Sequence, residues 1–151
     1  MNILIFGSSG FISSHLFDFL KKKNNIYGVD LKKSKITSFI SDIRKNIDID
    51  LMPIKFDLII NTAAIHREPG HKPHEYFNTN ILGAENICKF AEKINCNRII
   101  FTSSISPYGI AENLKDEATI PCPNTPYGSS KIVAEKIHIA WQNRDIKNRI
   151  L

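Results

Sequence analysis

Short apolar runs alternate with amphipathic stretches along this chain. Asn2–Phe6 and Asp57–Asn61 are rich in aliphatic side chains, as is typical of buried strands. Phe11–Lys23 places its apolar side chains at three- and four-residue intervals, as is typical of a helix packed on one face. The alternation predicts an α/β fold, in which helices cover both faces of a doubly wound parallel sheet.

The same patterns predict the order of the elements. We expect strands at Asn2–Phe6, Ile26–Asp30, Ile36–Ile40, Asp57–Asn61 and Arg98–Ser103, and helices at Phe11–Lys23, about Ile43–Leu51, about His74–Lys93 and roughly Pro126–Asn143. Apolar residues return at Ile150 and Leu151, which resemble the start of another strand. We therefore expect one domain over residues 1–151 that stops before its sixth strand.

Composition narrows the function classes. The chain has 151 residues, of which 42% are hydrophobic and 23% charged, as expected of one globular domain. Its net charge of +5 comes largely from dispersed lysines, which favour a solvated surface and an anionic small ligand over nucleic acid. Three widely spaced cysteines argue against a disulfide framework or a zinc site. We expect a cytoplasmic protein with no metal and no membrane partner.

The turn after the first strand has the spacing of a phosphate-binding loop. Gly7 allows a tight turn, Gly10 allows a phosphate to approach the backbone, and the following helix supplies free N–H groups. Ser13 stands where a third glycine is usual, so we expect weakened or shifted binding rather than none. The glycines alone could equally form an ordinary strand–helix turn.

Asp30 at the end of the second strand strengthens the interpretation of a cofactor site. A carboxylate there can accept hydrogen bonds from an adenosine ribose and repel a 2′-phosphate. This favours NAD over NADP, although Lys32 and Lys33 are close enough to reduce the preference.

Tyr127 and Lys131 carry the main chemical signal. Their spacing places them on one face of a helix, where the ammonium favours the ionised phenol as a proton acceptor. Ser103, Ser104 and Ser106 follow the fifth strand, where a hydroxyl can orient a reacting oxygen.

The segments "GSSGFIS", "VD", "SDI", "NTAA", "NTNILGAENI", "FTSSISPYG" and "PYGSSK" occur in this order. Together they resemble the extended short-chain dehydrogenase/reductases, and more narrowly the NAD-dependent epimerase/dehydratase family that acts on nucleotide sugars. The resemblance implies a Rossmann-like fold, NAD as cofactor and hydride transfer on a nucleotide-sugar substrate.

The resemblance also implies roles for matching residues. Ser104 is chosen over Ser103 because it lies four residues before Tyr108 of the "PYG" turn. The implied catalytic set is Ser104, Tyr127 and Lys131, and the implied cofactor contacts are Gly7, Gly10, Phe11 and Ile12 on the pyrophosphate, Asp30 on the adenosine ribose, Asp42 and Ile43 beside the adenine, Ala63, Ala64 and Asn80 along the strand ends, and Tyr127 and Lys131 at the nicotinamide end.

Several alternatives stay open. Members of this family normally run to about twice this length and carry a substrate lobe in the second half. From the resemblance we therefore expect a truncated form, a non-catalytic NAD-binding remnant or a subunit completed by a partner as alternatives to an autonomous enzyme. A small-carbonyl reductase could use the same catalytic set. The segment "TSSIS" lacks the acidic pair that dehydratases often carry, which favours an epimerase or a simple oxidoreductase.

The two longest helices and a cluster of three histidines also bear on partners and ligands. The two longest helices commonly form a homodimer interface in this family, so a homodimer is expected. His66, His71 and His74 lack a fixed metal-binding spacing, and His66, which follows the "NTAA" segment, is expected to lie near cofactor or substrate.

Overall fold

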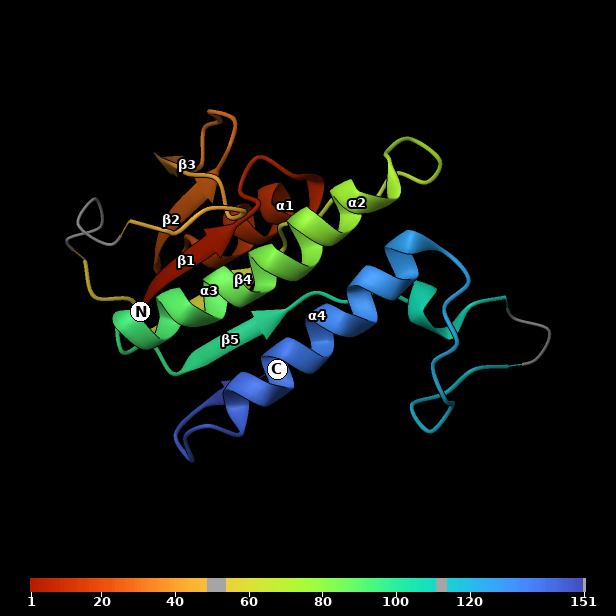
Figure 1. Ribbon diagram of the computed structural model, residues 1–151. Helices are drawn as coiled ribbons and strands as arrows, with labels where there is room; N and C mark the ends of the chain where they lie inside the picture. Colours follow the sequence, from red (N-terminus) through yellow and green to blue (C-terminus); the bar gives the residue numbers. More distant parts are fainter. Residues whose placement is uncertain (49–53, 111–113, 151) are drawn as a thin grey trace.

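A six-stranded parallel sheet is the centre of the computed structural model, which describes residues 1–48, 54–110 and 114–150 (Figure 1). The strand order is β3-β2-β1-β4-β5-β6. Strands β2 and β3 are therefore added on one side of β1, and β4, β5 and β6 on the other side. The doubly wound α/β fold is therefore confirmed. The strands are β1 (Asn2–Phe6), β2 (Asn25–Asp30), β3 (Thr37–Ile40), β4 (Leu58–Asn61), β5 (Arg98–Phe101) and β6 (Arg149–Ile150).

Helices cover both faces of this sheet. In Figure 1, α3 and α4 run side by side across one face, and α1 packs on the other. The helical segments are α1 (Phe11–Leu20), α2 (Pro73–Tyr76), the π-helical turn η1 (Phe77–Ile81), α3 (Leu82–Lys93), the short 3₁₀ turn η2 (Ser106–Tyr108) and α4 (Pro126–Gln142).

The buried strand β1 supplies side chains to two separate cores. Because successive side chains of a strand point to opposite faces, Ile3 and Ile5 meet α1 while Leu4 and Phe6 meet α3. The Phe6 and Phe90 rings contact each other edge to face, with centroids 5.9 Å apart. Burial on both faces explains why the sequence of β1 is apolar at consecutive positions.

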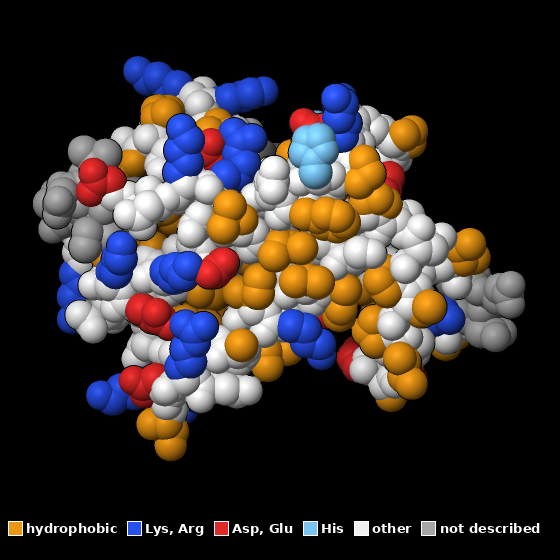
Figure 2. All heavy atoms as spheres, viewed as in Figure 1, with side chains coloured by type: hydrophobic (Ala, Val, Ile, Leu, Met, Phe, Trp, Pro, Cys, Tyr) orange, Lys and Arg blue, Asp and Glu red, His pale blue; other side chains and the backbone are white. Residues whose placement is uncertain are grey.

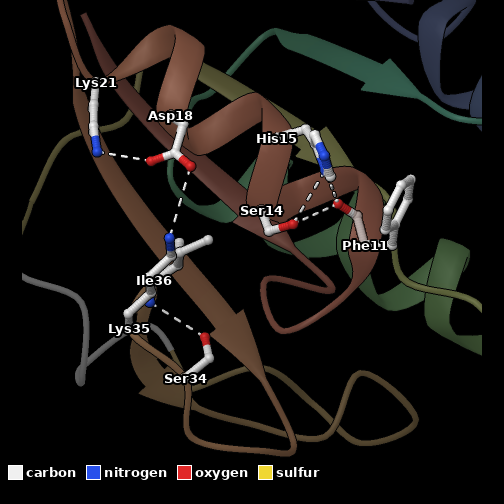
Figure 3. A network of polar contacts seen from close by, with 8 residues as sticks. All are labelled: Phe11, Ser14, His15, Asp18, Lys21, Ser34, Lys35 and Ile36. Carbon is white, nitrogen blue, oxygen red and sulfur yellow. Dashed lines mark hydrogen bonds and ion pairs between the residues drawn. The ribbon is translucent and has the colours of Figure 1, made fainter.

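Surface ion pairs join α1 to the segment before β3. Figure 3 shows the Asp18 carboxylate between two ammonium groups, 2.7 Å from Lys21 Nζ and 3.7 Å from Lys35 Nζ. The hydrogen bond from Lys21 lowers the pKa of Asp18, and both lysine charges lower it further. Exposed pairs of this kind add little to stability, so the position of α1 depends mainly on the apolar contacts of Leu16 and Leu20.

The prediction of a helix at about Ile43–Leu51 is wrong for residues 43–48, the part of this segment that the structure describes. Residues 43–48 form a turn and irregular chain, and residues 49–53 lie outside the described ranges. The Asp42 side chain accepts the Arg44 backbone N–H at 2.9 Å, and the Asp42 carbonyl accepts from Lys45 N–H. These bonds favour a turn over a helix, while Ile43 and Ile47 remain buried in the core.

A short sixth strand is present, contrary to our expectation that the chain stops before it. Arg149 and Ile150 pair in parallel with Arg98 and Ile99 of β5. The turn after α4 directs the chain to this position, because the Asn148 side chain donates to the Trp141 carbonyl at 2.9 Å. β6 therefore covers part of the edge of β5.

Candidate active site

A cleft of about 690 Å³ lies at the carboxyl ends of β1, β2, β4 and β5. This is the position where open parallel sheets bind ligands, next to the reversal of strand order. Of the predicted site residues, Ser104 and Asn80 are the two that do not line it. Those that do are Gly7, Gly10, Phe11, Ile12, Asp30, Asp42, Ile43, Ala63, Ala64, Tyr127 and Lys131.

Backbone segments pack so closely at the glycine turn that a Cβ would not fit at Gly7 and would be crowded at Gly10. Gly7 has a φ of +81°, and a Cβ there would lie 2.8 Å from the Ala63 backbone. A Cβ on Gly10 would lie 3.2 Å from the Gly7 carbonyl. α1 begins directly after Gly10 without a side-chain cap, so its first N–H groups are available to an anion. This turn therefore fits a pyrophosphate group.

Ser13 fits into the turn in place of the usual third glycine. Its side chain is fully buried, and its hydroxyl lies 2.8 Å from the Gly7 carbonyl and 2.7 Å from Thr62 Oγ1. The Thr62 hydroxyl also reaches the Phe6 carbonyl at 2.7 Å. Ser13 thus joins the turn after β1 to the end of β4 and leaves the helix N-terminus in place.

Replacing Ser13 with alanine is expected to lower the free energy of unfolding by about 1–2 kcal/mol, because buried partners lose a hydrogen bond. Urea denaturation measures this loss. Ser14→Ala is the matched control, since within the described part of the chain the Ser14 hydroxyl bonds to the Phe11 carbonyl and the adjacent His15 ring, both in its own turn of α1. Equal losses in the two variants would contradict the proposed link to β4.

Two carboxylates define the end of the cleft beside β2. Asp30 accepts the backbone N–H groups of Ser9 at 2.8 Å and Lys32 at 3.0 Å, so its orientation is fixed. Asp42 forms a bidentate pair with Arg44. Hydrogen bonding from the Arg44 side chain holds the Asp42 pKa below its usual value.

Arg44 was not predicted as a site residue, although it lines the cleft together with Lys32. The apolar pattern had predicted a helix at about Ile43–Leu51, which would include Arg44. Its position two residues after Asp42, which was predicted to lie beside the adenine, could have indicated that Arg44 also belongs to the site.

Tyr127 and Lys131 line the other end of the cleft from α4. The helix starts there because Thr125 accepts the Gly128 N–H at 3.1 Å and Pro126 occupies the first helical position. Lys131 is 2% exposed and donates to the Thr102 carbonyl at 2.6 Å. Burial lowers the Lys131 pKa to about 8.

The serines after β5 take different positions. The strand ends at Phe101, earlier than predicted, and Thr102 and Ser103 continue along the cleft. The Ser103 hydroxyl donates to Glu135 of α4. Ser104 accepts the Ser106 N–H at 3.1 Å, and its orienting role remains a prediction.

Asn80 lies behind the cleft, on the π-helical turn η1 where a continuous α-helix was predicted. Its buried amide donates to the Ile65 carbonyl at 3.1 Å and to Ser130 Oγ at 2.8 Å, and accepts the Ile65 N–H. It therefore joins the loop after β4 to α4.

His66 follows β4 and lines the cleft, as expected from the sequence. Within the described ranges, no three His, Cys, Asp or Glu side chains gather as a metal-binding group. No helix of that part of the chain is long and apolar enough to cross a membrane.

The fold and the cleft define a dinucleotide-binding type of α/β protein. The chain belongs to the NAD dependent epimerase/dehydratase family, whose model matches residues 3–150.

Similar proteins support this assignment. The chain is 32% identical over 154 residues to N-acetyl-alpha-D-glucosaminyl-diphospho-ditrans,octacis-undecaprenol 4-epimerase of Escherichia coli O157:H7, covering 99% of this chain and 46% of that protein. It is 28% identical to UDP-glucose 4-epimerase of Lactobacillus helveticus, covering 95% of this chain and 48% of that protein. The chain thus spans about half the length of the curated relatives it matches.

Solved structures show the same likeness. The UDP-glucuronic acid 4-epimerase of Bacillus cereus in complex with NAD has a TM-score of 0.82 at 26% identity, with 99% of this chain and 55% of that chain covered. The UDP-Glc/GlcNAc 4-epimerase of Campylobacter jejuni has a TM-score of 0.85 at 26% identity, with 99% and 51% covered.

Proposed function

We propose that this chain is the NAD-binding and catalytic portion of a nucleotide-sugar 4-epimerase. The observation that carries the proposal is a single cleft. It is lined by the glycine turn, by the Asp30 carboxylate and by the Tyr127–Lys131 pair. The relatives named above act as 4-epimerases, which supports this reaction over dehydration.

In the proposed reaction, the cofactor, Tyr127, Lys131 and Ser104 each have a separate role. Bound NAD would supply the acceptor for a hydride from a sugar carbon and the donor for its return to the opposite face. Tyr127 accepts the proton of the sugar hydroxyl and later returns it. The Lys131 ammonium holds the nicotinamide ribose and stabilises the ionised phenol. Ser104 orients the reacting oxygen.

The adenosine end selects NAD over NADP in this proposal. Asp30 accepts hydrogen bonds from the ribose hydroxyls, and its charge repels a 2′-phosphate. Lys32 and Arg44 line the same end of the cleft and reduce this preference. Gly7, Gly10, Phe11 and Ile12 hold the pyrophosphate.

A homodimer is part of the proposal. Hydrophobic side chains gather over α3 and α4 in Figure 2, and several of them are exposed to solvent. A second copy of the chain could cover this surface, as expected for two-fold packing of helix pairs. The exposed members are Leu82 on α3 and Val133 and Ile139 on α4, together with Phe77 on the adjoining turn η1.

The shared length with the relatives supports a second candidate. Because the chain corresponds to about half of each relative, it could bind NAD and depend on a further segment or partner for substrate.

The experiment that tests the proposed function is an incubation of the purified chain with NAD and UDP-glucose or UDP-N-acetylglucosamine. The proposal expects the 4-epimer among the products. Binding of NAD without epimer formation would favour the second candidate. Reduction of small ketones by NADH without epimerisation would instead indicate a small-carbonyl reductase.

A further inference from the structure

A buried histidine lies beneath the Tyr127–Lys131 pair without a part in the proposed chemistry. His138 follows Lys131 by seven residues on α4, about two helical turns, and therefore faces the sheet from the same side of the helix. Its side chain is 0% exposed. Burying an imidazole costs free energy that an aliphatic side chain would not, unless each nitrogen finds a partner.

Both ring nitrogens of His138 have partners. Nδ1 lies 2.7 Å from the Ala134 carbonyl, which can only accept, so Nδ1 carries the hydrogen. Nε2 then accepts from the Asn61 side-chain amide at 3.4 Å. The Asn61 orientation is fixed from its other end, because its Oδ1 accepts the Ala63 N–H at 3.2 Å. The hydrogen bonds therefore assign a neutral imidazole with one defined tautomer.

The imidazole also sets the position of an aromatic ring. His138 and Phe101 stack with centroids 4.2 Å apart and an interplanar angle of 19°. The Lys131 ammonium lies 4.2 Å from the centre of that Phe101 ring. A cation held against an aromatic face is stabilised there when it is shielded from water. His138 thus contacts the ring that Lys131 contacts.

From these contacts we infer that His138 is a positioning residue, which holds the Phe101 ring under the Lys131 ammonium and joins it through Asn61 to the cleft backbone at Ala63. The inference rests on the proposed role of Lys131 in binding the nicotinamide ribose. It adds a residue that touches neither substrate nor cofactor and acts through its neighbours.

The charges around this group agree with a neutral histidine. Lys131 and Glu135 flank it on α4, and Tyr127 lies one turn before Lys131. Burial lowers the His138 pKa and outweighs the hydrogen bond to the Ala134 carbonyl, which raises it, and the Lys131 charge lowers it further. Glu135 acts in the opposite direction on Lys131, whose pKa it raises.

The test is NMR of the chain labelled at lysine, with the Lys131 signal assigned by its loss in Lys131→Met. Ring current from Phe101 shifts the Lys131 side-chain methylene protons upfield, and Phe101→Leu defines the unshifted position. His138→Leu is expected to remove most of this shift, because the ring loses its stacking partner. His138→Phe keeps an aromatic partner and is expected to retain it.

Ala140→Ser, an exposed change on the same helix, is the matched control and leaves the shift unchanged. Retention of the full shift in His138→Leu would overturn the inference, and so would its loss in His138→Phe. Should neither variant fold, nitrogen NMR of the unchanged chain decides: a neutral Nδ1–H imidazole at pH 7 supports the inference, and a tautomer mixture overturns it.

The NMR result does not depend on cofactor binding. A chain that shows the shift but binds no NAD would refute the proposed function and leave the positioning by His138 intact. In a chain that does bind NAD, His138→Leu is expected to weaken NAD affinity about tenfold. His138→Phe keeps the ring partner of Phe101 but loses the contact with Asn61, and it is expected to weaken NAD affinity less than His138→Leu does.

Discussion

Replacing Gly7 with alanine is expected to lower the free energy of unfolding by about 3 kcal/mol and to abolish NAD binding. The φ of +81° disfavours any side chain with a Cβ, and that Cβ would lie 2.8 Å from backbone atoms of Ala63. Relief of the contact would move the turn that faces the pyrophosphate. Urea denaturation and calorimetric titration with NAD measure the two effects.

Gly70→Ala is the matched control for this substitution. A Cβ at Gly70 would lie 3.3 Å from the Arg67 side chain, and its backbone does not require a left-handed conformation. We expect Gly70→Ala to change the free energy of unfolding by less than about 1 kcal/mol. Similar losses in the two variants would contradict the packing described for Gly7.

The buried Lys131 predicts an unusual dependence of stability on pH. Its native pKa is lowered to about 8 by burial, against 10.5 for the free side chain. Between these values the unfolded chain binds more protons than the native one, so stability rises with pH through this window. The contribution reaches about 3 kcal/mol, at 1.36 kcal/mol for each unit of pKa.

Measurement of this contribution requires comparison with Lys131→Met, since other groups then titrate alike in both proteins. The free energy of unfolding of the unchanged chain is expected to rise by about 3 kcal/mol relative to the variant between pH 8 and 10.5. Lys136→Met removes an exposed lysine from the same helix and serves as control. A constant difference between the unchanged chain and Lys131→Met would show that burial does not lower the Lys131 pKa.

Periodicity predicted most of the fold because it reports burial directly. β1 was predicted with its observed bounds, since both of its faces are covered and its side chains are consecutively apolar. The segment from Ile43 was mispredicted as a helix because its apolar spacing outweighed the turn made by Asp42. The two-residue β6 depends on the distant hydrogen bond from Asn148 to Trp141, which no local pattern reveals.

The candidate site was predictable where the chemistry depends on sequence spacing. The glycine turn, Asp30 and the Tyr127–Lys131 pair could be recognised in this way, and all of them line one cleft. The His138–Asn61 contact could not, because the two residues are 77 positions apart in the sequence and meet only when α4 packs on β4.

A calorimetric titration of the 151-residue chain with NAD and, separately, with NADP tests most directly whether the cleft is a cofactor site. We expect saturable binding of NAD and weaker binding of NADP, with the preference reduced in Asp30→Asn. Failure of a demonstrably folded chain to bind either nucleotide would show that the cleft is not a cofactor site.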